Sequence, residues 1–241
     1  MCGRFAQIQT RADYLDVLAS DLEFAGALDN VPIARYNVAP GTRVLILNQR
    51  DDKLHFDPVD WGYGPDWWRE MRRQPVINAR VETAATSRMF KPLWNHGRAL
   101  VMADGWYEWK KDKHEAKVKQ PYFIYHESKA PIFFAAISRH HPDAKDHPDA
   151  KDPPDDDGFV IVTCASDSGL LDIHDRRPVV LPPAAAREWI KPDITSARVE
   201  ELANEAATSP DDFAWHPVGK SVGNIRNDSA ELIKPIANPL V

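Results

Sequence analysis

The chain has 241 residues, of which 43% are hydrophobic and 27% are charged, proportions typical of one globular domain with a sizeable core. Two cysteines are too few for a disulfide framework or a cysteine-rich zinc site. No apolar run is long enough to cross a bilayer. The formal net charge of −6 argues mildly against nucleic-acid binding, because phosphate contacts require local positive charge.

The first third of the chain predicts one helix and a strand pair. Thr10 with Asp13 three residues later is typical of a helix N-terminus, and apolar side chains then recur at helical spacing. Residues 37–41 predict a turn or loop, and residues 44–47 and 54–58 predict two paired strands. The tryptophan-rich stretch 61–68 indicates a structured loop.

The rest of the chain predicts many short strands with irregularly placed helices. Helical turns are expected in 83–94 and helices in 183–190 and 195–206, whereas apolar runs predict strands at 99–102, 122–125, 132–134 and 159–163. Regular alternation of strands and helices is absent. We therefore expect an α+β fold whose antiparallel sheets close, or nearly close, into a barrel-like core surrounded by helices. One domain over 1–235 and a tail over 236–241 are expected.

One low-complexity segment lies within 139–157. The hexapeptide His-Pro-Asp-Ala-Lys-Asp occurs at 141–146 and again at 147–152, followed by a run of prolines and aspartates. Such a segment buries too little apolar surface to offset its ordering entropy. We expect a solvated loop between two strands rather than a metal site.

Cys2 carries the most distinctive chemistry. Removal of Met1 would leave Cys2 with a free α-amine and a thiol on adjacent carbons. An aldehyde condenses with the amine to an imine, and the thiol then closes a five-membered thiazolidine in an intramolecular step. The α-amine has a pKa of roughly 7.7–8.0, so part of it is neutral near pH 7. From its position alone, the simpler interpretation is that Cys2 is a small buried residue at an ordinary chain start.

Other polar residues stand in segments that otherwise resemble core. Glu108 lies among aromatic residues in the sequence. Desolvation there would raise its pKa and suit it to acid–base catalysis. Alternatively, Glu108 forms a salt bridge in a strand. His174 could transfer protons near neutral pH, or be held by a neighbouring aspartate in a turn. Asn78, Arg80 and Glu82 alternate along the chain and would share one face of an extended segment. Arg80 could then bind a phosphate. Alternatively, the segment is a surface strand without a binding role.

The combination and order of the motifs are more specific than any one of them. They are Met1-Cys2-Gly3-Arg4-Phe5, Tyr36-Asn37-Val38-Ala39-Pro40-Gly41, Trp61-Gly62, Asn78-Ala79-Arg80-Val81-Glu82-Thr83, Arg88-Met89-Phe90, Ala103-Asp104-Gly105-Trp106-Tyr107-Glu108-Trp109 and Asp172-Ile173-His174-Asp175-Arg176-Arg177-Pro178. The sequence thereby resembles the SRAP (SOS response-associated peptidase) family, in its bacterial branch, from Met1 to about Pro235.

The resemblance implies covalent capture of abasic sites in single-stranded DNA. Cys2 would form the crosslink, Asn37 would lie beside it and orient the sugar, Glu108 would position the amine and transfer protons, and His174 would assist imine formation and reversal. The DNA would be contacted by Arg4, Pro40, Trp67, Trp68, Asn78, Arg80, Arg88 and Thr163. Cys164 is expected to be structural. The only expected partner is abasic single-stranded DNA, bound by a cytoplasmic monomer without cofactor, metal or membrane.

Two other functions fit the same residues. A cysteine peptidase would use Cys2 as nucleophile, His174 as base and Asp172 or Asp175 to orient the imidazole. A noncatalytic module would bind single strands through aromatic and arginine side chains alone.

Overall fold

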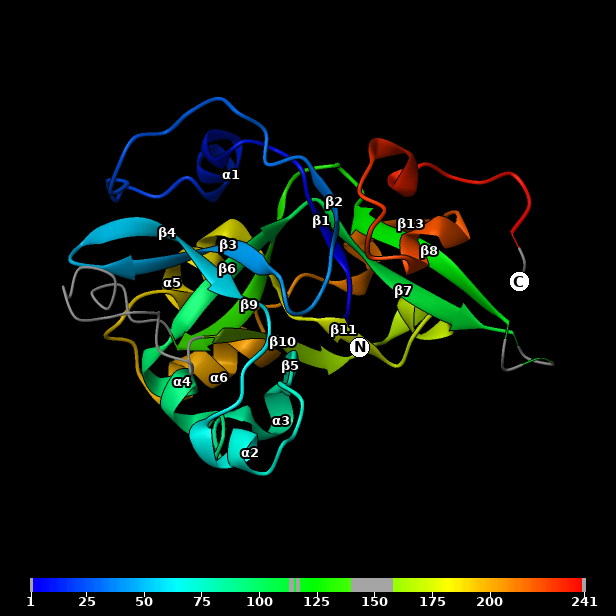
Figure 1. Ribbon diagram of the computed structural model, residues 1–241. Coiled ribbons are helices and arrows are strands. Elements are labelled where there is room, and N and C mark those ends of the chain that lie inside the picture. Colours follow the sequence, from blue (N-terminus) through cyan, green and yellow to red (C-terminus); the bar gives the residue numbers. More distant parts are fainter. Residues whose placement is uncertain (1, 113–114, 116–117, 140–157, 240–241) are drawn as a thin grey trace.

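The computed structural model describes residues 2–112, 115, 118–139 and 158–239 (Figure 1). The strands in these ranges are β1 (Phe5–Gln7), β2 (Arg35–Val38), β3 (Arg43–Arg50), β4 (Lys53–Asp60), β5 (Asn78–Arg80), β6 (Arg98–Ala103), β7 (Gly105–Lys111), β8 (Lys119–His126), β9 (Ile132–Arg139), β10 (Gly158–Ala165), β11 (Arg176–Pro178), β12 (Val180–Leu181) and β13 (Phe213–Pro217). The α-helices are α1 (Arg11–Leu18), α2 (Asp66–Glu70), α3 (Val81–Ala84), α4 (Lys91–His96), α5 (Pro183–Trp189) and α6 (Ser196–Asn204). Short 3-10 helices are η2 (Ser168–Asp172), η3 (Pro210–Asp212), η4 (Lys220–Gly223) and η5 (Ala230–Ile233).

The strands form two sheets. The smaller sheet has the order β13-β8-β7-β1-β2, and the larger has the order β11-β10-β9-β6-β3-β4, with β12 paired to β9 and β5 paired to β10. The β5–β10 pair is parallel, with Asn78 opposite Ile161 and Arg80 opposite Thr163. Among the described residues neither sheet closes on itself, so the α+β class is confirmed and the barrel-like core is wrong.

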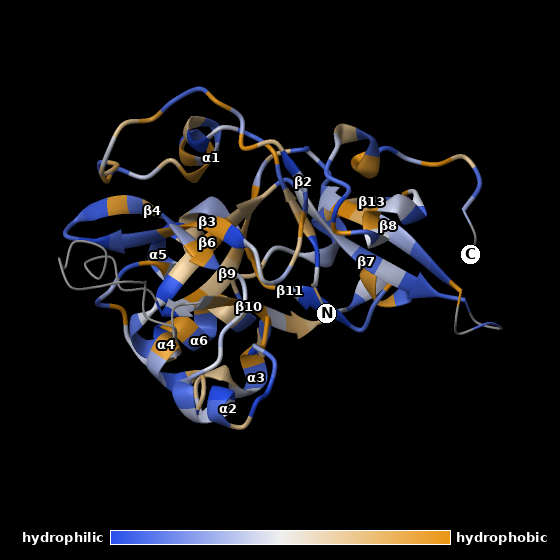
Figure 2. Cartoon of the chain, viewed as in Figure 1, coloured by the Kyte–Doolittle hydropathy of each residue, from blue (hydrophilic) through white to orange (hydrophobic). Residues whose placement is uncertain are grey.

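The two sheets instead pack face to face. Phe5 and Trp106 from the smaller sheet meet Phe134 and Ile161 from the larger sheet in one buried cluster. Hydropathy follows this arrangement, since the central strands β9 and β10 are hydrophobic and the far ends of β7 and β8 are hydrophilic (Figure 2). Short apolar runs predict strands but do not specify which strands pair, and closure depends on that pairing.

Each sheet has a second covered face, because side chains alternate along a strand. Helices α1, α3, α4, α5 and α6 bury their apolar residues against the far face of the larger sheet. The far face of the smaller sheet is covered by C-terminal residues, among them Val218, Val222 and Leu232. The layers are therefore helices, larger sheet, smaller sheet and C-terminal segment.

Several local predictions can be compared with this structure. Thr10 caps α1 as expected, with the Asp13 amide donating to Thr10 Oγ1 at 3.0 Å. The extended segment 78–82 is wrong beyond Arg80, because α3 begins at Val81 and packs Val81 and Ala84 on the core. The loop predicted at 37–41 is wrong in part, because Asn37 and Val38 belong to β2. The duplicated hexapeptide lies outside the described residues.

Candidate active site and nucleic-acid surface

Cys2 lies buried where the two sheets meet, just before β1. Its side chain is 0% exposed, and Sγ lies 3.9 Å from the Arg4 carbonyl oxygen. From the larger sheet, Asn78 Nδ2 donates to the Cys2 carbonyl at 2.9 Å. Burial raises the pKa of the Cys2 thiol well above its usual value, and the Glu108 carboxylate raises it further. The thiol is therefore protonated at neutral pH.

Glu108 reaches the same place from the smaller sheet. Phe5 pairs with Trp106, and the Tyr107 amide donates to the Arg4 carbonyl at 2.9 Å. Continued antiparallel register places Glu108 opposite Gly3, beside Cys2. Glu108 is only 3% exposed. Burial raises its pKa to about 7, in the direction that the sequence predicted, and a carboxyl group with this pKa can exchange protons near neutrality.

His174 stands across from Glu108, between η2 and β11. Its Nε2 lies 4.0 Å from Glu108 Oε2, while Nδ1 accepts from the Arg176 amide at 3.0 Å and lies 2.8 Å from Asp175 Oδ1. These two contacts of Nδ1 hold the ring with Nε2 facing Glu108. Burial lowers the pKa of His174, which keeps the ring neutral at pH 7.

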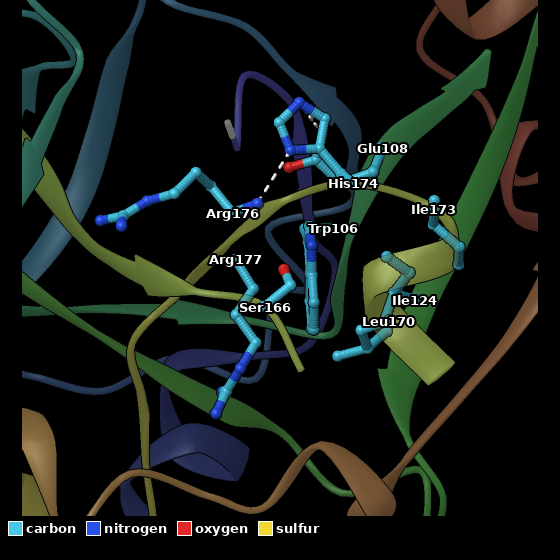
Figure 3. A pocket seen from close by; sticks show the side chains of 9 residues that line it. All are labelled: Trp106, Glu108, Ile124, Ser166, Leu170, Ile173, His174, Arg176 and Arg177. Atoms are coloured by element: carbon cyan, nitrogen blue, oxygen red, sulfur yellow. Dashed lines mark hydrogen bonds and ion pairs between the residues drawn. The ribbon is translucent and has the colours of Figure 1, made fainter. Parts of the chain in front are cut away.

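A narrow crevice continues from this pair into the space between the sheets. Figure 3 shows His174 and Glu108 together at one end, with the guanidinium groups of Arg176 and Arg177 directed away from them. The remaining lining residues are Trp106, Ile124, Ser166, Leu170 and Ile173. Glu108 thus lies in a low-dielectric surrounding, where its electrostatic interactions are strengthened, whereas His174 is partly exposed to solvent.

The surface around β5 combines arginines and tryptophans. Arg80 and Arg88 are exposed, and the Arg88 guanidinium lies 4.7 Å from the ring centroid of Trp67. Arg73 covers the ring of Trp68 in the same way, at 4.6 Å. Both indoles are half-buried against the helical side of the core. The pattern of cations over aromatic rings is typical of single-strand-binding surfaces.

Comparison with known proteins identifies the family. The family model described as SOS response associated peptidase (SRAP) matches residues 1–225. The chain belongs to the SRAP family. It is 55% identical to the abasic site processing protein YedK of Escherichia coli (strain K12) over 236 residues, 98% of this chain and 100% of YedK.

More distant SRAP relatives and solved structures agree with this assignment. The mouse abasic site processing protein HMCES is 28% identical, over 83% of this chain and 64% of HMCES. The crystal structure of a phage-related protein from Bordetella bronchiseptica superposes with a TM-score of 0.74 at 36% identity, covering 91% of this chain and 95% of that chain. A Bacteroides thetaiotaomicron protein shares the fold, with a TM-score of 0.73 at 18% identity, covering 98% of this chain and 100% of that chain.

Two predicted site residues of this SRAP chain have other contacts. Asn37 Nδ2 donates to the carbonyls of Val222, Asn224 and Asn227 at 3.2, 3.1 and 2.8 Å. Arg4 Nη1 donates to Asn37 Oδ1 at 2.8 Å and to the Val222 carbonyl at 2.7 Å. Asn37 and the Arg4 guanidinium therefore fasten the C-terminal segment. The side chain that donates to the Cys2 carbonyl is that of Asn78, which the sequence placed in the DNA surface.

The other predicted DNA contacts divide by exposure. Pro40 is exposed, whereas Thr163 is completely buried. Thr163 Oγ1 lies 3.4 Å from the Ala79 carbonyl, and its strand β10 is paired to β5. The structure therefore leaves no atom of Thr163 exposed for a DNA contact. Cys164 is half-buried, and burial raises the pKa of its thiol, which suits the structural role expected for it.

Sequence reasoning missed the role of Arg176. Its guanidinium donates to Glu82 Oε2 at 3.0 Å and to the Thr163 carbonyl at 2.6 Å, and its amide orients His174. Arg176 thereby joins β11, β10 and α3 around the site. Its position two residues after His174 in the recognised motif was the available signal.

Two features are absent from the described part of the chain. No three His, Cys, Asp or Glu side chains are grouped there as metal ligands. No helix among those residues has the length and apolar character needed to span a membrane.

Replacing Glu108 with glutamine is expected to stabilise the fold at high pH. The folded-state pKa of about 7 exceeds the ordinary value of roughly 4.3, so the wild type loses stability as the pH rises between these values. Glu108→Gln should therefore raise the free energy of unfolding by about 1–3 kcal/mol at pH 8, and by little at pH 4. Urea unfolding at both pH values measures this, with the exposed Glu205→Gln as control. Equal effects at both pH values would contradict the raised pKa.

Proposed function

We propose that this SRAP protein is an abasic site processing protein that captures the aldehyde of an abasic site in single-stranded DNA through Cys2. The observation that carries this proposal is the meeting of Cys2, Glu108, Asn78 and His174 at one junction between the sheets. The relatives YedK and HMCES, both of which are named abasic site processing proteins, support the same conclusion. Single-stranded DNA is the partner; we expect a monomer acting without cofactor.

The chemistry begins after Met1 is removed. The Cys2 amine attacks the aldehyde carbon, and a proton moves to the oxygen to give a carbinolamine. Water then leaves and a C=N bond forms. Finally the thiol S–H adds across this bond: sulfur bonds to carbon, the proton goes to nitrogen, and the thiazolidine ring closes. The thiol proton thus ends on the nitrogen, and the ring closure consumes no further reactant.

The neighbouring groups divide the proton transfers. Glu108 holds the amine when it is cationic and accepts its proton, which a carboxyl group with a pKa of about 7 does near neutrality. His174, whose neutral form burial favours and whose Nε2 faces Glu108, exchanges protons with the departing or returning water. Asn78 holds the Cys2 carbonyl and thereby orients the residue.

The same electrostatics disfavour the peptidase alternative. A cysteine peptidase attacks with a thiolate, whose pKa is lowered by an adjacent cation. Burial and Glu108 raise the pKa of Cys2 instead. A noncatalytic module, for its part, has no need of a carboxyl group buried beside Cys2.

A denaturing gel separates these functions. The protein is mixed with a single-stranded oligonucleotide that carries one abasic site, and the sample is heated in detergent. Covalent capture gives a slower band that survives heating, and reduction of the aldehyde with borohydride before mixing prevents it. Intact binding in a native gel without a heat-stable band would leave only the noncatalytic module.

Arg80→Ala should weaken noncovalent binding and lower its dependence on salt. Arg80 is exposed at the end of β5, two residues beyond Asn78. Each phosphate contact contributes a slope of roughly −0.7 to log affinity against log salt for single strands. Binding of an abasic oligonucleotide to Cys2→Ala and to Cys2→Ala with Arg80→Ala, titrated over salt, measures the difference. The exposed Arg226→Ala serves as control, and an unchanged slope would give Arg80 a purely structural role.

A further inference from the structure

The ion pair between Glu82 and Arg176 lies beside His174 but takes no part in the proton transfers. Arg176 Nη1 donates to Glu82 Oε1 at 2.5 Å, and Nη2 donates to Oε2 at 3.0 Å. Two parallel bonds between a guanidinium and a carboxylate fix the relative orientation of the two groups as well as their distance. The hydrogen bonds to Arg176 lower the pKa of Glu82, so the pair is ionic at neutral pH.

Glu82 belongs to a well-packed part of the fold. It lies in the first turn of α3, whose Val81 and Ala84 are buried in the core between the helices and the larger sheet. The strand β5 leads directly into α3 and is paired in parallel with β10. A guanidinium bound to Glu82 is therefore tied to this framework.

Arg176 stands where the sheet itself gives less support. It begins β11, a strand of three residues at the edge of the larger sheet. Its backbone pairs with Ala165 of β10, and its guanidinium donates to the Thr163 carbonyl of the same strand at 2.6 Å. Because an edge strand is paired on one side only, the side-chain bonds of Arg176 contribute much of what holds the start of β11.

The Arg176 backbone joins this ion pair to the imidazole. Its amide donates to His174 Nδ1 at 3.0 Å, and Figure 3 shows this bond on one side of Arg176 and the guanidinium on the other. His174 Nε2 then lies 4.0 Å from Glu108 Oε2. Asp175 also approaches Nδ1, at 2.8 Å, but its side chain is 80% exposed. A shift of the Arg176 amide is therefore expected to move Nε2 relative to Glu108.

We infer that Glu82 is a positioning residue: through Arg176 it holds the His174 imidazole opposite Glu108 and so maintains the rate of crosslink release. The inference rests on the proposed function, in which His174 transfers protons during ring opening and imine hydrolysis. Arg176 separates Glu82 from the imidazole, so Glu82 acts through geometry. A displacement of about 1 Å at a catalytic site can cost about 100-fold in rate, so loss of the Glu82 contact should slow release roughly tenfold or more.

The test follows release of a preformed crosslink from the wild type, Glu82→Ala, His174→Gln and the double variant, each chased with excess competing abasic DNA. Glu82→Ala should slow release roughly tenfold or more in the wild-type background, and no further in the His174→Gln background. A merely structural effect of Glu82 would be the same in both backgrounds. Dissociation constants of the same variants carrying Cys2→Ala give the noncovalent affinity separately, because Glu82 also interacts with Arg80.

Glu188→Ala is the matched control. Glu188 forms the same kind of two-bond pair with Arg198, at 2.7 and 2.8 Å, between α5 and α6. Its removal should leave release at the wild-type rate. Glu82→Gln is nearly the same size as the wild type and keeps one acceptor oxygen for Arg176, so it should slow release by a smaller factor. Glu82→Gln carries the comparison if thermal unfolding shows that Glu82→Ala is not folded.

Two results would overturn the positioning role while leaving capture by Cys2 intact. One is release at the wild-type rate by every Glu82 variant that is folded. The other is equal slowing by a Glu82 variant with and without His174. Failure of the wild type to form a crosslink would instead overturn the proposed function.

Discussion

Cys2→Ala is expected to abolish the heat-stable DNA adduct completely. Alanine keeps the α-amine but removes the thiol, so the reaction stops at the imine, which hydrolyses. The imine should still be trapped by borohydride, which reduces C=N to a stable amine. The measurement is a denaturing gel with and without borohydride.

Cys164→Ala provides the matched control, because the chain has only these two cysteines. Cys164 is half-buried on β10 with a raised thiol pKa, and its removal should leave crosslinking at the wild-type level. Intact-mass analysis of the wild type should show that Met1 is absent. A heat-stable adduct formed by Cys2→Ala, or full crosslinking by protein that retains Met1, would refute the thiazolidine mechanism.

Glu108→Gln and His174→Gln should impair different steps. Glu108 accepts the proton of the attacking amine, so Glu108→Gln should slow adduct formation roughly 100-fold, within the usual range for a general base. The wild-type rate should rise as the pH increases through about 7, where Glu108 loses its proton, and the variant should lack this inflection. Initial rates of crosslinking between pH 5 and 9 give the comparison.

His174→Gln should form the adduct and release it slowly. Ring opening and imine hydrolysis need a group that gives and takes protons near pH 7, and the imidazole opposite Glu108 meets this need. The preformed crosslink is chased with excess competing abasic DNA, and exchange is followed over time. Exchange at the wild-type rate by His174→Gln, or wild-type crosslinking by Glu108→Gln, would contradict this division of steps.

Asn78 shows why a motif specifies candidate residues better than it specifies their roles. Asn37 and Asn78 are both asparagines in recognised motifs, and the sequence assigned the position beside Cys2 to Asn37. The structure places Asn37 under the C-terminal segment and Asn78 on the Cys2 carbonyl. The difference arises because β5 pairs with β10, and strand pairing between distant segments is not encoded in either motif.

The sequence by itself determined the family, the α+β class, the position of Cys2, and the presence of Glu108 and His174 as candidate acid–base groups. These features depend on residue identity, local spacing and short periodic patterns, as the Thr10 cap of α1 illustrates. Only the tertiary structure decided that the sheets pack without closing, that Glu108 titrates near pH 7, and that Thr163 is buried. Burial and pKa both depend on which distant segments meet, because desolvation and electrostatic fields are properties of the packed molecule.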